Sequence, residues 1–216
     1  ESVPYFYNGY YYLTRYEKGK DYPIYSRKKG SLDAKEEILF DCNEMAKGHS
    51  YFNLNGVSVS EDNKWVTFGV DTVSRRQYTI QVKNLVSGEI LPEKIENTTG
   101  STAWSSDNKT FFYTKKDPKT LRSVKIYRHE LKNDAKNDVM VFHEKDDTFY
   151  TFVYKEKSKK YLVIGSTSTL TSEYQILESN NPTGNFTVFS KRERGLEYNI
   201  SHYGDSFYVL TNKDKA

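Results

Sequence analysis

The chain has 216 residues, enough to bury a sizeable core if the fold closes on itself. Hydrophobic residues make up 36% of the chain and aromatic residues 15%. A sequence this rich in aromatic side chains is not expected to be intrinsically disordered. The 32 basic and 29 acidic side chains are interspersed and give a net charge of +3, so the composition predicts neither a nucleic-acid partner nor a membrane partner. The single cysteine, Cys42, excludes an intrachain disulfide and a cysteine-based metal site.

The first predicted unit covers residues 5–41 and lacks one convincing strand. Its three predicted strands are Tyr10–Tyr16, Tyr22–Lys28 and Glu36–Asp41. A Gly-Lys-Asp turn at Gly19–Asp21 joins the first two. Residues 42–53 are then a connector that has room for a helical turn.

The second unit, residues 54–95, has the clearest pattern. Its predicted strands are 56–60, 64–71, 77–85 and 89–95. Asp62 and Asn63 tolerate the positive φ of a tight hairpin turn. Val66, Phe68 and Val70 alternate with Trp65, Thr67 and Gly69. Because successive side chains of a strand point to opposite faces, we expect Val66, Phe68 and Val70 to face the sheet of a neighbouring unit.

The remaining chain repeats this pattern in units at residues 100–143, 148–191 and, as a partial unit, 197–212. The predicted strands are 101–105, 109–115, 124–131, 138–143, 149–154, 160–167, 173–178, 186–191, 197–202 and 206–211. Equivalent large apolar residues, Trp65, Phe111, Tyr161 and Phe207, are spaced by 46, 50 and 46 residues. A period of this size built from strands and tight turns is typical of β-propeller blades. The sequence therefore predicts an all-β, incomplete propeller of four-stranded antiparallel blades.

Catalytic, cofactor and metal motifs are absent from the sequence. It contains no Gly-x-Ser-x-Gly, P-loop, zinc or dinucleotide motif, and the nearest serines, Ser58 and Ser166, lie in predicted strands. We expect the four histidines (His49, His129, His143 and His202) to be surface or satisfied core residues. The loop pair Arg75 and Arg76 is a candidate for contact with an acidic surface of another domain, and a solvated loop is the alternative.

Five segments resemble the propeller of oligopeptidase B, also called protease II, in the prolyl oligopeptidase family. They are YEKGKDYPIYSRK (16–28), VDTVSRRQYTIQVKNLVSGEILPE (70–93), KIYRHEL (125–131), EKDDTFYTFV (144–153) and TSEYQIL (171–177). The resemblance implies a seven-bladed propeller, of which this chain holds the N-terminal part with about four to five blades. It also implies that the propeller caps a C-terminal α/β-hydrolase domain, which is absent from this chain.

What the resemblance implies about function belongs to the intact protein. A Ser-Asp-His triad in the hydrolase domain would cleave short peptides after Lys or Arg, and none of its residues has a position in this sequence. The expected partners are that hydrolase domain and short basic peptides, and no cofactor is implied. By family resemblance, the compartment would be the cytoplasm or periplasm of a bacterium.

Two alternatives remain at the level of sequence. The chain could come from a proline-specific oligopeptidase or a dipeptidyl peptidase, or it could be a non-enzymatic propeller that binds other proteins. The half unit at residues 197–212 argues against the second alternative, because an independent propeller would complete its ring.

An open arc of blades leaves the faces of its terminal blades without neighbours. We therefore expect the isolated chain either to be marginally stable or to associate with a second copy through its exposed blade edges. Sedimentation velocity and thermal melting test this expectation. A compact monomer that melts cooperatively would contradict it.

Overall fold

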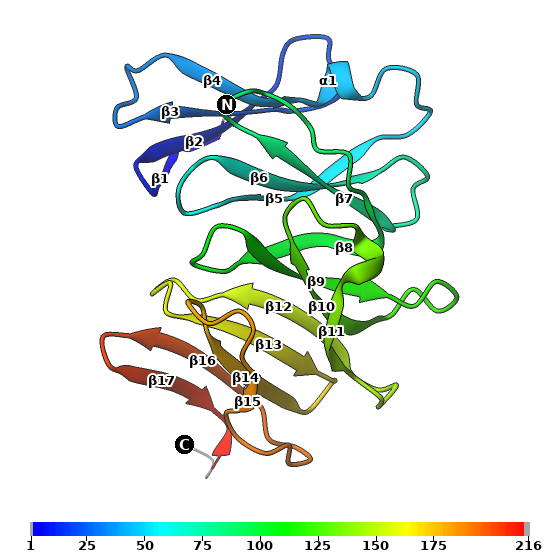
Figure 1. The fold of residues 1–216 in the computed structure, drawn as a ribbon, viewed down its shortest axis with the longest axis vertical. Helices are drawn as coiled ribbons and strands as arrows, with labels where there is room; N and C mark the ends of the chain where they lie inside the picture. Colours follow the sequence, from blue (N-terminus) through cyan, green and yellow to red (C-terminus); the bar gives the residue numbers. More distant parts are fainter. Residues whose placement is uncertain (1, 214–216) are drawn as a thin grey trace.

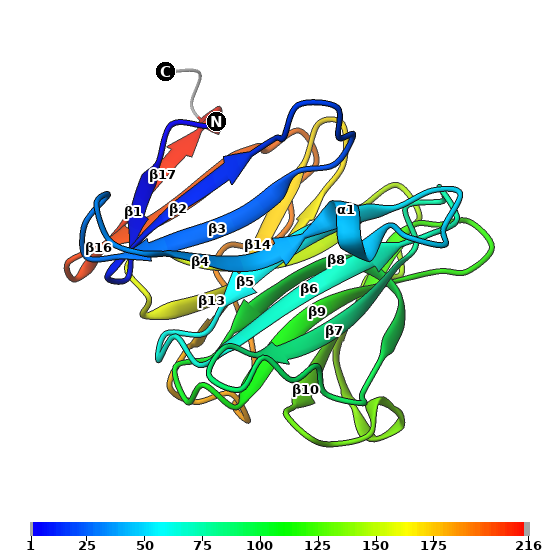
Figure 2. The same cartoon turned by 90° about the horizontal axis from the view of Figure 1, so that it is seen from above.

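The computed structural model describes residues 2–213, which form a stack of antiparallel sheets with a single turn of α-helix. The sheets follow one another in chain order from the blue N-terminal end to the red C-terminal end of Figure 1. Figure 2 looks along this stack and shows the strands of successive sheets turned relative to one another. The architecture is that of an incomplete β-propeller.

The first blade is a complete four-stranded sheet. Its strands are β1 (Tyr5–Tyr7), β2 (Tyr10–Arg15), β3 (Ile24–Lys29) and β4 (Glu36–Asp41). The sequence prediction missed β1, which is only three residues long and exposed, so it shows no alternation between buried and polar positions. The connector begins with α1 (Cys42–Met45), whose first turn is capped by the Asp41 carboxylate. The helical turn expected there is confirmed.

The second and third blades share one strand and so form a single seven-stranded sheet. The sheet contains β5 (Asn53–Val59), β6 (Trp65–Asp71), β7 (Tyr78–Asn84), β8 (Ile95–Trp104), β9 (Thr110–Lys116), β10 (Ser123–Glu130) and β11 (Val139–His143), with the 3₁₀ turn η1 (Ala135–Asn137) before β11. The start of β8 pairs with β7, and its end pairs with β9. The strand predicted at residues 89–95 is therefore wrong, because residues 89–94 contribute only an isolated bridge at Ile90.

The fourth blade is again four-stranded, and the last sheet has two described strands. The fourth contains β12 (Tyr150–Lys155), β13 (Tyr161–Thr167), β14 (Ser172–Glu178) and the short β15 (Thr187–Val188). The last contains β16 (Tyr198–Tyr203) and β17 (Ser206–Thr211). The free face of the last sheet exposes Tyr203, Tyr208 and Leu210 by 78%, 62% and 76%. Large apolar side chains at this end of the arc thus have no cover within residues 2–213.

Separate apolar cores hold neighbouring blades together. Val66 and Phe68 are fully buried against the first blade, where the Phe68 ring lies 4.5 Å from the Phe40 ring. This confirms the predicted orientation of that strand face. Phe112 of the third blade meets Phe186 of the fourth at 5.5 Å. Each blade therefore depends on its neighbour for much of its buried apolar surface.

The two ends of the blades differ in the segments that they carry. At one end, which we call the hairpin face, lie the turns between the first and second strands of each blade. At the other end, the loop face, lie the loops between second and third strands and the connectors between blades. On the hairpin face the turns are linked: Asn8 Nδ2 donates to the Glu61 carbonyl at 2.6 Å, and the Asp62 amide donates to Asn108 Oδ1 at 3.0 Å. Lys159 Nζ of the fourth blade reaches Asn8 Oδ1 of the first at 3.2 Å.

A close crossing of backbones fixes the bend of β8. Gly100 lies at φ +86° and its backbone crosses directly over Gly56 and Gly69. A Cβ atom at Gly69 would lie far inside van der Waals contact with the Gly100 Cα atom. Two backbones can approach so closely only where side chains are absent.

We predict that Gly69→Ala destabilises the chain by about 2 kcal/mol or more, because neither backbone can move without breaking sheet pairing. Gly88→Ala is the matched control: its site is open but has φ +80°, so it should lose only about 1 kcal/mol. Urea unfolding followed by circular dichroism measures both. Equal losses in the two variants would show that the crossing is not constrained.

Candidate functional site

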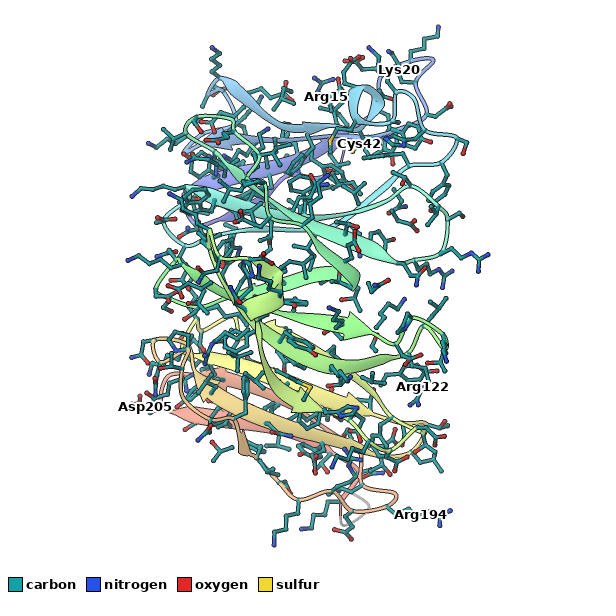
Figure 3. The ribbon with its side chains drawn as sticks, turned by 45° about the vertical axis from the view of Figure 1, so that its right-hand side comes forward. Arg15, Lys20, Cys42, Arg122, Arg194 and Asp205 are labelled. Carbon is teal, nitrogen blue, oxygen red and sulfur yellow. The ribbon has the colours of Figure 1, made fainter. Side chains whose placement is uncertain are left out.

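The loop face carries several exposed basic side chains, among them Arg75, Arg76 and Arg194. In Figure 3, Arg122 and Arg194 project from this face, whereas Asp205 marks the hairpin face on the opposite side. Arg194 forms no ion pair within residues 2–213. The chain approaches β1 from the loop face, and the connectors before β5, β12 and β16 lie on this face.

The loop that holds Arg75 and Arg76 is shaped by a buried carboxylate. Asp71, at the end of β6, is 1% exposed and accepts hydrogen bonds from the backbone N–H groups of Val73, Arg75 and Arg76 at 2.9, 3.0 and 2.7 Å. Lys116 Nζ donates to the Arg76 carbonyl at 2.8 Å. Both arginine side chains are exposed on this preformed loop.

Sequence reasoning found the two arginines but missed Asp71, which organises their backbone. The available signal was the Asp-x-x-Ser-Arg-Arg order, because an Asp side chain commonly accepts from backbone N–H groups a few residues later in a turn. The pKa of Lys116 is lowered, first by burial and then by the Arg76 charge, against the opposing effect of Asp71. The loop thus carries two exposed guanidinium groups on a backbone that Asp71 and Lys116 hold in place.

Two other arginines clamp the connector between the third and fourth blades. Arg192 donates to Glu144 Oε2 at 2.6 Å and to Glu173 Oε1 at 3.3 Å, and its guanidinium lies 3.7 Å from the centre of the Phe149 ring. Arg122 donates to the Phe149 carbonyl at 2.6 Å. The connector is therefore held from both sides, by a loop of the third blade and by the connector that leaves the fourth.

The titration of Glu144 is set by this clamp. Burial raises the pKa of Glu144, but the hydrogen bonds from Arg192 and the Asp146 amide, together with the Arg192 charge, outweigh burial and lower the pKa below its ordinary value. A carboxyl whose pKa is lower in the folded state stabilises the fold at any pH above its unfolded-state pKa. This contribution is lost as the pH falls through the folded-state pKa.

The histidines do not form a reactive site in residues 2–213. His129 is fully buried, and its Nδ1 lies 2.7 Å from Asp138 Oδ1, while the Tyr113 hydroxyl donates to Asp138 Oδ2 at 2.8 Å. His202 is buried between the rings of Tyr161 and Phe207, and His49 and His143 are exposed. The expected surface and core positions are confirmed, but the two core histidines are not fully satisfied, since His129 Nε2 and His202 Nδ1 have no hydrogen-bond partner within residues 2–213. No cluster of three or more metal-ligating side chains occurs in this part of the chain.

None of the helices described in residues 2–213 is long and apolar enough to cross a membrane.

We predict that Glu144→Gln lowers the free energy of unfolding at pH 7 by about 1 to 3 kcal/mol, because Arg192 loses the nearer of its two charged partners and keeps only Glu173. As the pH falls from the ordinary carboxyl value of 4.5 through the lower folded-state pKa of Glu144, the contribution of the carboxylate charge is lost, so the difference between the two proteins should shrink. Urea midpoints at pH 7 and at pH 3.5 measure this. A difference that stays constant over this range would contradict the role of the carboxylate charge.

Comparison with known proteins places this geometry in a family. A family model described as "Prolyl oligopeptidase, N-terminal beta-propeller domain" matches residues 1–216. Dipeptidyl aminopeptidase BI of Pseudoxanthomonas mexicana is 38% identical over all of this chain, and Protease 2 of Moraxella lacunata is 32% identical over 98% of it. The structure of oligopeptidase B from Leishmania major superposes with a TM-score of 0.91 at 32% identity, covering 99% of this chain and 31% of that one.

The chain spans about a third of the length of these relatives, since it covers 32% of each of the two sequences. The four-stranded antiparallel blades, the match along the full chain and the similarity to oligopeptidase B agree with one another. The chain therefore belongs to the prolyl oligopeptidase family and forms part of its N-terminal β-propeller domain.

Proposed function

We propose that this chain is the propeller part of a serine peptidase that cleaves short peptides after Lys or Arg. Its role is to restrict access to the active site and to contact the hydrolase domain. The observation that carries the proposal is the similarity to oligopeptidase B along 99% of the chain. In this proposal a Ser-Asp-His triad in the hydrolase domain performs acyl transfer, and opening between the two domains controls substrate access.

The strand topology supports contact through the loop face. A blade of four antiparallel strands returns the chain to the face from which it started. Since β1 starts at the loop face and the connectors lie there, a domain joined in sequence to whole blades is tethered on that side. Arg75 and Arg76 project from this face on a loop whose backbone is fixed by Asp71. They are therefore well placed to meet acidic groups of the hydrolase domain.

A second function has a specific observation in its favour. The relative that is 38% identical to this chain is named a dipeptidyl aminopeptidase. An enzyme that removes dipeptides requires a free amino terminus, whereas an endopeptidase does not. Cleavage of a peptide with an internal arginine, before and after acetylation of its amino terminus, separates the two. Full activity on the acetylated peptide would support the endopeptidase, and its loss would support the dipeptidyl peptidase.

We predict that charge reversal of both loop residues, Arg75→Glu with Arg76→Glu, lowers kcat/KM of the intact peptidase about tenfold or more. Opposite charges at a domain contact would become like charges. The matched control is Lys109→Glu with Lys157→Glu, two exposed lysines on hairpin-face turns. The control should keep its rate and both proteins should melt normally. An unchanged rate in the arginine variant would overturn the role of this loop.

We predict that the chain of residues 1–216 alone does not hydrolyse an arginine-containing chromogenic dipeptide, because the proposal assigns the nucleophile and its base to the hydrolase domain. Release of the chromophore is followed with the purified chain at micromolar concentration, and the intact peptidase serves as the positive control. Turnover that persists through successive purification steps would contradict this assignment.

A further inference from the structure

A hollow of about 610 Å³ lies on the loop face beside the arginine clamp. Three segments line it: the connector 146–149, the turn 168–171 between β13 and β14, and the connector 192–194 that follows the fourth blade. Arg194, which is labelled in Figure 3, comes from the last of these segments. The hollow is thus lined by the connectors that enter and leave the fourth blade and by one turn of that blade.

The walls of this hollow are fixed by hydrogen bonds within the chain. The Asp146 carboxylate accepts from the Thr148 amide at 2.9 Å and from its hydroxyl at 2.7 Å. The Ser168 amide donates to the Thr171 carbonyl at 2.9 Å. The Gly195 amide donates to Thr171 Oγ1 at 3.1 Å, which ties the turn to the connector that carries Arg194. A ligand would therefore meet a preformed surface and order few groups on binding.

The two arginines of the hollow differ in their availability. Arg192 is committed to Glu144 and Glu173 and lies flat on the Phe149 ring. Arg194 is exposed and has no ion pair within residues 2–213. Leu170, which also lines the hollow, exposes 63% of its surface in the turn between β13 and β14. The hollow also holds the exposed Asp146 carboxylate, which accepts hydrogen bonds from Thr148. The only basic group in its lining that has no ion pair within residues 2–213 is the Arg194 guanidinium.

We propose that this hollow binds a carboxylate carried by a peptide, with Arg194 as its cation and Leu170 as the contact for a neighbouring apolar side chain. A guanidinium matches a carboxylate in two parallel hydrogen bonds. The carboxylate is either the C-terminus of the peptide or an acidic side chain. The inference rests on the proposed function in one respect: if the loop face contacts the hydrolase domain, the hollow faces the space between the two domains. It makes Arg194 a specificity-determining residue of the peptidase.

Equilibrium binding tests the proposal separately from catalysis. Fluorescence anisotropy would be measured with the intact protein after covalent block of its serine, using four labelled peptides of one arginine-containing sequence. Two differ only in a C-terminal carboxylate or amide, and two differ only in Glu or Gln beside a Leu. The carboxylate forms should bind about two- to fivefold more tightly, as expected for a solvent-accessible ion pair, and higher salt should reduce the difference.

The variant Arg194→Gln should abolish this preference while leaving the binding of the uncharged peptides unchanged. The matched control, Lys191→Gln, changes an exposed basic residue outside the lining of the hollow and should retain the preference. A preference confined to one pair of peptides identifies the source of the carboxylate. Equal binding of all four peptides, or a preference that survives Arg194→Gln, would overturn the proposal. Failure of the proposed function would appear differently, as absent cleavage of any peptide by the unblocked protein.

Discussion

A sheet that is apolar on both faces is stable only between two neighbours, and this constraint governs the whole chain. Phe68 and Val66 have no exposed surface because the first blade covers one face of the second, and Phe112 and Leu162 are equally buried between the third and fourth. Burial at this scale is the main favourable contribution to folding. The blades therefore fold as members of an array, and the position of every loop follows from the packing of the sheets behind it.

The packing of the sheets determines where the charged groups of the loop face lie. Because the strands below are fixed, short loops can hold charged groups in defined places with few contacts of their own. Asp71 fixes the backbone of one loop from beneath, and Arg192 binds Glu144 and Glu173 across a blade boundary. Both arrangements leave other cations, Arg75 and Arg194 among them, directed outward. A rigid face with outward-directed guanidinium groups is well suited to recognise carboxylates on a domain or a peptide.

Much of the fold could be predicted from the sequence because its strands alternate and its turns contain Asn, Asp and Gly. The regular spacing of Trp65, Phe111, Tyr161 and Phe207 identified the blades. The prediction failed at β1, which is three residues long and exposed throughout, and at residues 89–94, where only Ile90 forms a bridge and Pro92 has no backbone N–H to donate to a neighbouring strand. The arginine pair was visible as a motif, but the hollow at Arg194 was not, because its walls come from residues up to 48 positions apart that only the packing brings together.

The bent strand β8 has a consequence for how the array could be rearranged. Since one continuous segment completes the second blade and opens the third, the two blades cannot be exchanged or duplicated singly without leaving an unpaired edge in the other. For the same reason, an insertion or new chain termini placed between these two blades would interrupt β8. The smallest unit that could be exchanged in this propeller is thus the second and third blades together, joined at the connectors before β5 and after β11.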